Sequence, residues 1–144
     1  MAAWRLSGRA AGADRGPAQT LLAAWDDDPA LPALWIGLTG RDQKLTVILG
    51  AAPGRSPHSW IGPAVAPGQA FDLQVAIHRG MGPGGVLWRT DDDAPWSSFA
   101  SPSAWGPERL RWPAIWRIGV GKGDDDRRFL GTGISISTVA SDAR

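Results

Sequence analysis

The chain of 144 residues contains no cysteine, no tyrosine and a single glutamate, Glu108. Without cysteine it can form neither a disulfide framework nor a thiolate metal site. Long hydrophobic runs are missing too: the opening residues hold no apolar segment of signal-peptide length, and the longest early apolar run is 21–25. That run is far shorter than a membrane span requires. We therefore expect no cleaved signal peptide and no membrane-spanning segment.

An excess of charge of one sign is also missing. The 15 lysines and arginines nearly balance the 14 acidic residues, which gives a formal net charge of +1. Domains that bind nucleic acid usually present a strongly basic surface. We therefore expect no nucleic-acid partner.

Glycine, proline and tryptophan are plentiful. The chain has 19 glycines, 12 prolines and nine tryptophans. So many aromatic residues argue against disorder, and the length is that of one domain, 1–144. Proline or glycine interrupts almost every stretch of a dozen residues, and a proline inside a helix costs roughly 3 kcal/mol. This composition favours a single all-β domain of short strands joined by turns.

The alternation of apolar and polar residues predicts eight or nine short strands and no helix. The strongest signal is a hairpin, in which alternating residues over 32–39 and 44–49 flank the polar turn 40–42. The segment 80–85 is a second expected hairpin turn, and 8–17 and 91–114 are expected to be irregular. The remaining expected strands are 19–25, 58–65, 71–77, 86–88, 115–120 and 134–138. Two stacked antiparallel sheets accommodate this number of strands.

Three aspartate triplets stand out, at 26–28, 91–93 and 124–126. Ca²⁺ takes six to eight oxygen ligands, and carboxylates clustered in turns can supply them. The alternative is that each triplet forms a solvated turn, because aspartate readily ends strands. The candidate metal ligands are Asp91, Asp92, Asp93, Asp124, Asp125 and Asp126.

Trp96 and Trp105 lie in the long irregular stretch and are the best candidates for an exposed aromatic platform. The apolar face of a sugar ring stacks on a flat aromatic side chain, and its hydroxyls need polar partners nearby. Ser101, Ser103 and Arg109 could supply these. The alternative is that both indoles anchor the loop or the core. Trp60 is a weaker platform candidate, and the other strand tryptophans are expected in the core: Trp25, Trp35, Trp88 and Trp116.

Several segments resemble laminin-G-like domains of the concanavalin A-like lectin/glucanase superfamily. The likeness is clearest over 116–123 and 128–137, which resemble that fold's closing hairpin, and it extends to 21–25, 44–50 and 67–77. The chain departs from the pattern at Ala70 and Phe71, where Trp-His is common in the family. The resemblance implies an all-β, two-sheet antiparallel jelly-roll sandwich, and many relatives bind Ca²⁺. Fold alone does not choose among the superfamily's functions.

The resemblance also bears on catalysis. Laminarinase-type relatives use paired glutamates on one strand, and alginate-lyase relatives use a tyrosine, whereas this chain has one glutamate and no tyrosine. We therefore expect no enzyme. The expected function is non-catalytic recognition of a surface glycan or polysaccharide. The alternative is a structural or adhesion subunit of a larger assembly, such as a secreted complex or virus-like particle, that docks other protein subunits. The sequence assigns no compartment; an extracellular or particle-associated location would suit either function.

Overall fold

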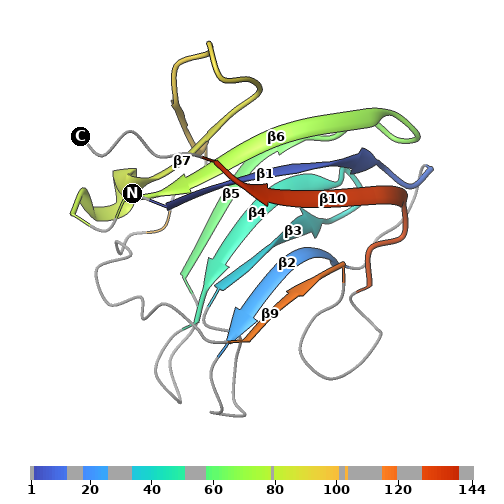
Figure 1. Cartoon of the computed structure of the whole chain (residues 1–144), viewed down its shortest axis with the longest axis horizontal. Helices are drawn as coiled ribbons and strands as arrows, with labels where there is room; N and C mark the ends of the chain where they lie inside the picture. Colours follow the sequence, from blue (N-terminus) through green and yellow to red (C-terminus); the bar gives the residue numbers. More distant parts are fainter. Residues whose placement is uncertain are drawn as a thin grey trace.

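A computed structural model describes residues 2–12, 18–25, 34–50, 58–78, 80–100, 103, 115–119 and 128–139. Within these ranges the protein is all-β, apart from one short 3₁₀ turn, and two five-stranded antiparallel sheets pack face to face (Figure 1). The prediction of an all-β, two-sheet architecture is confirmed. No helix in the described ranges is long and apolar enough to cross a membrane.

The first sheet, sheet A, joins segments from both ends of the described chain. Its strands, in spatial order, are β10 (Thr132–Thr138), β1 (Ala2–Arg9), β6 (Ala70–Ile77), β7 (Val86–Arg89) and β8 (Ser97–Ser98). β1 therefore lies between two strands that are distant in the sequence. Its register pairs Leu6 with Ile136 of β10 and with Leu73 of β6.

The second sheet, sheet B, is built mainly from consecutive strands. Its strands, in spatial order, are β5 (His58–Ala64), β4 (Lys44–Leu49), β3 (Leu34–Thr39), β2 (Gln19–Trp25) and β9 (Ile115–Ile118). The chain crosses between the sheets after β1, β5, β8 and β9. In Figure 1 the two sheets lie one above the other, with β10 and β9 on the same side of the sandwich.

The core lies where the predicted alternation places it. Leu34, Ile36 and Leu38 of β3 pair in register with Leu49, Val47 and Leu45 of β4, and all six are buried. Residues directly opposite each other in an antiparallel pair share a face, so this hairpin presents one continuous apolar surface to sheet A. On the facing sheet, β6 buries Phe71, Leu73, Val75 and Ile77. The predicted hairpin and the predicted strand over 71–77 are both confirmed.

The turn between β6 and β7 contains the 3₁₀ segment Gly82–Gly85. Ile77 pairs with Val86 across it, as the predicted hairpin turn requires. The Trp60 indole Nε1 donates a hydrogen bond to the Pro83 carbonyl oxygen at 2.9 Å. Trp60 is fully buried, so its interpretation as an exposed platform is wrong: its ring fills the core and its one polar atom supports the turn.

Buried glutamines tie together one end of the sandwich. Gln43 has φ 51°, in the left-handed region, and ends the β3–β4 turn. Its Nε2 donates to the Ala11 carbonyl oxygen at 3.1 Å, and its Oε1 accepts from Gln19 Nε2 at 3.2 Å. Gln19 Oε1 in turn accepts from the backbone N–H of Leu130 at 3.1 Å. These bonds link four segments and satisfy polar groups that burial would otherwise leave unpaired.

Three expectations about strands are wrong. The stretch 91–114, expected to be irregular, contains the short strand β8 (Ser97–Ser98), and the described residues form ten strands rather than eight or nine. Residues 8 and 9 belong to β1 rather than to a loop, because both neighbours of β1 continue their pairing to Arg9. The last two strands do not form a closing hairpin: β9 pairs with β2 of sheet B, whereas β10 pairs with β1 of sheet A. Each strand finds its hydrogen-bonding partner in a different sheet, so the chain between them crosses the sandwich.

Candidate functional site

The predicted site residues divide into two groups. Asp91, Asp92, Asp93, Trp96 and Ser103 are described. The other predicted residues lie outside the described residues, namely Ser101, Trp105, Arg109, Asp124, Asp125 and Asp126, together with the triplet 26–28. The site is therefore built from the segment between β7 and β8 and from the strands beneath it.

Asp91 shapes the turn that follows β7. Its Oδ1 accepts hydrogen bonds from the backbone N–H groups of Asp93, at 2.9 Å, and Ala94, at 2.8 Å. This is the local side-chain-to-backbone bonding for which aspartate is favoured in turns. The solvated-turn interpretation thus accounts for one of the three carboxylates.

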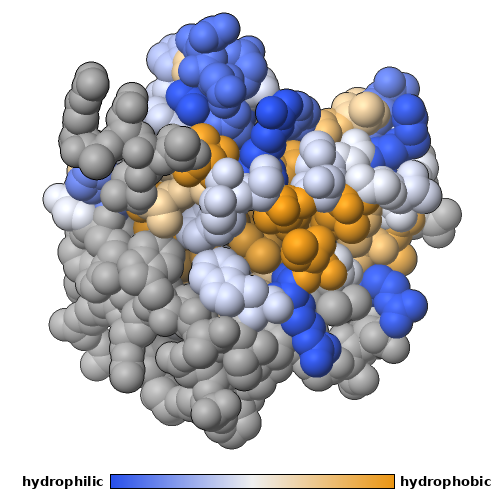
Figure 2. All heavy atoms as spheres, in the orientation of Figure 1, coloured by the Kyte–Doolittle hydropathy of each residue, from blue (hydrophilic) through white to orange (hydrophobic). Residues whose placement is uncertain are grey.

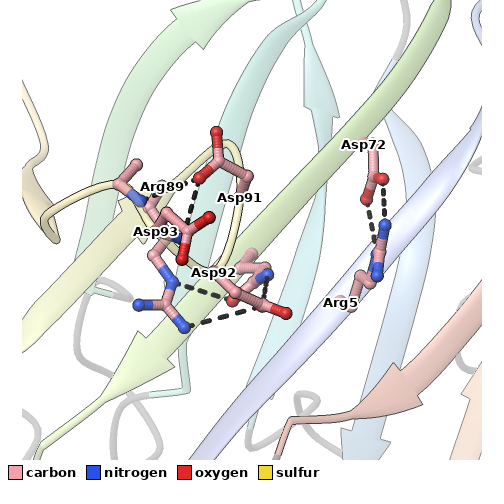
Figure 3. Close-up of polar contacts among 8 residues, drawn as sticks. Arg5, Asp72, Arg89, Asp91, Asp92 and Asp93 are labelled. Atoms are coloured by element: carbon pink, nitrogen blue, oxygen red, sulfur yellow. Dashed lines mark hydrogen bonds and ion pairs between the residues drawn. The ribbon is translucent and has the colours of Figure 1, made fainter.

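Asp92 is directed to a different partner, on sheet A (Figure 3). Its Oδ1 accepts a hydrogen bond from Gln74 Nε2 at 2.6 Å and lies 3.8 Å from Arg89 Nη2. Gln74 is buried, and its Oε1 accepts from Arg89 Nε at 2.8 Å. The side-chain amide of Gln74 thus bridges the Arg89 guanidinium and the Asp92 carboxylate, and both its oxygen and its nitrogen are hydrogen-bonded.

The triplet does not act as one ligand set. Among the described residues, no group of three or more histidine, cysteine, aspartate or glutamate side chains is arranged to hold a metal ion. The triplet 124–126 lies outside that search. Binding of Ca²⁺ stays a prediction.

Trp96 packs on the same arginine. The Arg89 guanidinium carbon lies 4.1 Å from the centroid of the Trp96 ring. A cation over an indole face at this distance is attracted by the ring quadrupole, with about 0.5–1 kcal/mol at exposed sites. Trp96 is half-buried, so its ring is held in one orientation while part of it remains accessible. The sequence indicated Trp96 but not Arg89.

A row of polar side chains crosses the outer face of sheet A. Arg5 pairs in register with Ser137 of β10 on one side and with Gln74 of β6 on the other, and Gln74 pairs with Arg89 of β7. Side chains alternate between the two faces of a strand, and Leu6 and Val75 face the core. The four neighbours therefore point outward; we call Ser137, Arg5, Gln74 and Arg89 the polar row.

Arg5 is also paired along the sheet. Its Nε donates to Asp72 Oδ1 at 2.8 Å and its Nη2 donates to Asp72 Oδ2, a two-point arrangement visible in Figure 3. The hydrogen bonding by Arg5 holds the pKa of Asp72 below its ordinary value, and partial burial opposes this shift. The same hydrogen bonding raises the pKa of Arg5. Both side chains are exposed, so water and salt screen the pair.

A second surface has the opposite character. Trp116 and Ile118 of β9 are 40% and 50% exposed, and Leu130 is 46% exposed. Figure 2 shows hydrophobic surface in this region, between β10 and β9. The register with β2 puts Trp116 and Ile118 on the face that carries the core residues Ala24 and Leu22. We call this the open side: Trp116, Ile118 and Leu130 with the inward-facing residues of β10.

The open side corrects one expectation about the tryptophans. Trp35 is buried and Trp88 packs partly against the core, whereas nothing is described of the Trp25 side chain. Trp116, expected in the core, is instead partly exposed, with its ring tilted on Trp4 at a centroid distance of 5.8 Å. β9 is the last strand of its sheet among the described residues, so the described chain places a neighbouring strand on one side of Trp116.

No family model matches the chain, and the comparison with curated proteins finds no match.

Proposed function

We propose that this domain is a non-catalytic glycan-recognition module whose binding site lies on the outer face of sheet A, beside Trp96. The observation that carries the proposal is the half-buried Trp96 ring held by Arg89 at 4.1 Å next to the polar row. An aromatic ring that is already fixed loses little conformational entropy when a ligand stacks on it. Pre-organisation of this kind suits a binding site.

The surroundings of Trp96 meet the second requirement of a sugar site. Hydroxyl groups need both donors and acceptors, and this cluster contains an exposed acceptor, Asp92, and a mostly buried donor, Arg89. Asp92 has acceptor oxygens, and the Arg89 guanidinium has several N–H donors of which one is committed to Gln74. Ser101, Ser103 and Arg109 extend the proposed site along the chain, and Trp105 supplies the second proposed platform.

The proposed fold is a jelly roll of the concanavalin A-like kind. It is supported by the crossing of the chain between two antiparallel sheets and by the laminin-G-like motifs that fall on strands β2, β4 and β6. The motifs over 116–123 and 128–137 do not add to this support, because β9 and β10 lie in different sheets. Ca²⁺ near 91–93 or near 124–126 is the proposed means of ordering the loops. A domain of this kind would act on the outside of a cell or particle.

The test is a glycan array screened with the purified protein, once with Ca²⁺ and once with chelator, followed by titration of the best glycan in solution. We expect Trp96→Ala to weaken binding about tenfold or more, equivalent to ~1.4 kcal/mol. Trp116→Ala is the matched control, because it removes a partly exposed indole from a different surface. Equal affinity of Trp96→Ala and the unmodified protein would contradict the proposed site. Binding that is lost on chelation would support the proposed Ca²⁺ site. Binding that persists with chelator would contradict that site.

The second candidate function is a docking subunit of a larger assembly, and the open side favours it. Monomeric proteins rarely leave large contiguous apolar patches exposed, and such patches mark interaction sites. Self-association that added sugar leaves unchanged, together with an empty glycan array, would favour this candidate over the first.

A further inference from the structure

We infer that the outer edge of β10, with which no strand of the described residues pairs, pairs with the same edge of a second copy of this chain, so that two sheets A join across a two-fold axis. This inference does not rest on glycan binding. It specifies, for the second candidate function, which partner docks and which strand makes the contact.

The edge strands of the two sheets differ in how they discourage pairing. Natural edge strands are protected by short length, proline, charged side chains or bulges. β8 has two residues, β5 contains Pro63 and a register shift, and the four-residue β9 contains Arg117. β10 is seven residues long, and no proline or charged residue occurs over 129–139. Its one irregularity is a register shift near Gly133, which has φ 65°.

The backbone of β10 offers hydrogen-bonding groups on its free side. The Val139 N–H donates to the Ala3 carbonyl oxygen of β1 at 2.9 Å. Backbone groups of successive residues in an antiparallel strand point to opposite sides. The N–H and C=O groups of Ile134, Ile136 and Thr138 therefore point away from β1, toward the edge where the described chain contributes no further strand.

The side chains make this edge complementary to itself. An antiparallel copy centred on Ile136 pairs Ile136 with its own counterpart, Ile134 with Thr138 and Ser135 with Ser137. All five residues lie beyond the irregularity near Gly133. Ile134 and Ile136 pack toward the core of their own copy, and pairing residues that face each other keeps both isoleucines on that side. Such a pairing is isologous, the usual form of homodimer contact.

The same pairing covers the open side. In each copy, Trp116 and Ile118 of β9 face inward below β10, so a sheet continued past β10 extends over them. Standard interfaces bury about 800 Å² per partner with 20–30 residues, so the roughly ten residues of β10 and the open side would bury about 300–400 Å² per copy. This area is below that of a permanent dimer. We therefore expect weak, reversible association, with Kd on the order of 0.1 mM.

The experiment is sedimentation velocity of the full chain from about 10 μM to 1 mM, the range that brackets this Kd. We expect the mean mass to rise toward that of a dimer. The double variant Ser135→Lys, Ser137→Lys places like charges opposite each other across the two-fold axis, on side chains that are exposed in the single copy. It should remain monomeric at every concentration, as should Ser135→Glu, Ser137→Glu. An equimolar mixture of the two should recover the dimer, which also shows that both variants fold.

Ser98→Lys is the control, because it adds a charge at the opposite edge of sheet A and should leave association unchanged. The inference is overturned if the unmodified chain stays monomeric up to about 1 mM, the upper end of the range set by the expected Kd. It is also overturned if the double lysine variant still dimerises, which would assign the contact to another surface, or if the mixed variants fail to associate. Association only with an added extended peptide, and never with a second copy, would replace the proposed partner by a foreign strand.

Discussion

The outer and inner faces of sheet A are made from neighbouring residues of the same strands, yet they differ in character: the outer face carries the polar row, and the inner face ends at the open side. Arg5 and Leu6 are adjacent in β1, and Ser137 and Ile136 are adjacent in β10. The outward member of each pair joins the polar row. The inward member faces the other sheet, where Leu6 is completely covered and Ile136 only partly. Strand alternation decides the face of a side chain, whereas its distance from the sheet edge decides how well that face is covered.

The largest effect expected from this comparison is on stability. Leu6→Ala removes a fully buried side chain from the middle of sheet A and should lower the free energy of unfolding by about 2–5 kcal/mol. Ile136→Ala, at the position paired with it, should cost about half as much or less, because part of that side chain is exposed in the single copy. Chemical denaturation at low protein concentration, where the chain is monomeric, measures both. Equal losses would show that the open side is as well packed as the centre.

An intermediate effect is expected at the centre of the polar row. Arg89→Met keeps much of the side-chain volume but removes the cation above Trp96 and the donor to Gln74. It should lower stability by about 1–2 kcal/mol, since a buried amide oxygen loses its partner, and should weaken glycan binding through loss of the fixed indole. The indole N–H signal of Trp96 in two-dimensional NMR, assigned by its loss in Trp96→Phe, reports the ring's release. Unchanged stability and an unchanged Trp96 signal would contradict the role given to Arg89.

The smallest effect is expected from the exposed ion pair. The pKa of Asp72 in the folded protein lies below its ordinary value of 3.8, so the unfolded chain binds this proton more readily. The pair's contribution is therefore present above that ordinary value and lost as pH falls through the lower, folded-state pKa. The stability difference between the unmodified protein and Asp72→Asn should be small at neutral pH, shrink with added salt and vanish in acid. A difference that grew in acid would have the wrong sign.

The strands that were predicted correctly are those whose sequences show one clear apolar face. β3, β4 and β6 were predictable because each places one clear apolar face in the core. β1 was missed because its apolar positions are interrupted by alanine and glycine. The exposure of Trp116 was not predictable, since inward alternation looks the same at the edge of a sheet as at its centre.

The candidate site was predictable only where it is local. The turn at Asp91 follows from a known preference of aspartate, and Trp96 stood out in the irregular stretch beyond it. The contacts among Gln74, Arg89 and Asp92 join different strands and a loop, and the Arg5–Asp72 pair spans 67 positions. Such contacts depend on strand register, which residue types alone do not specify. Sequence reasoning therefore found the aromatic candidate but not the polar groups that hold it.

The surface beside Trp96 and the open side should bind different partners, a glycan and a second copy of this chain respectively. Two-dimensional NMR of indole and backbone N–H groups, with assigned signals, would be recorded during titration with the best array glycan and during concentration of the free protein. Glycan should shift the signals of Trp96 and Arg89, whereas concentration should shift those of Ile136 and Trp116. Glycan-induced shifts confined to Trp116 and β10, with Trp96 unmoved, would contradict this expectation.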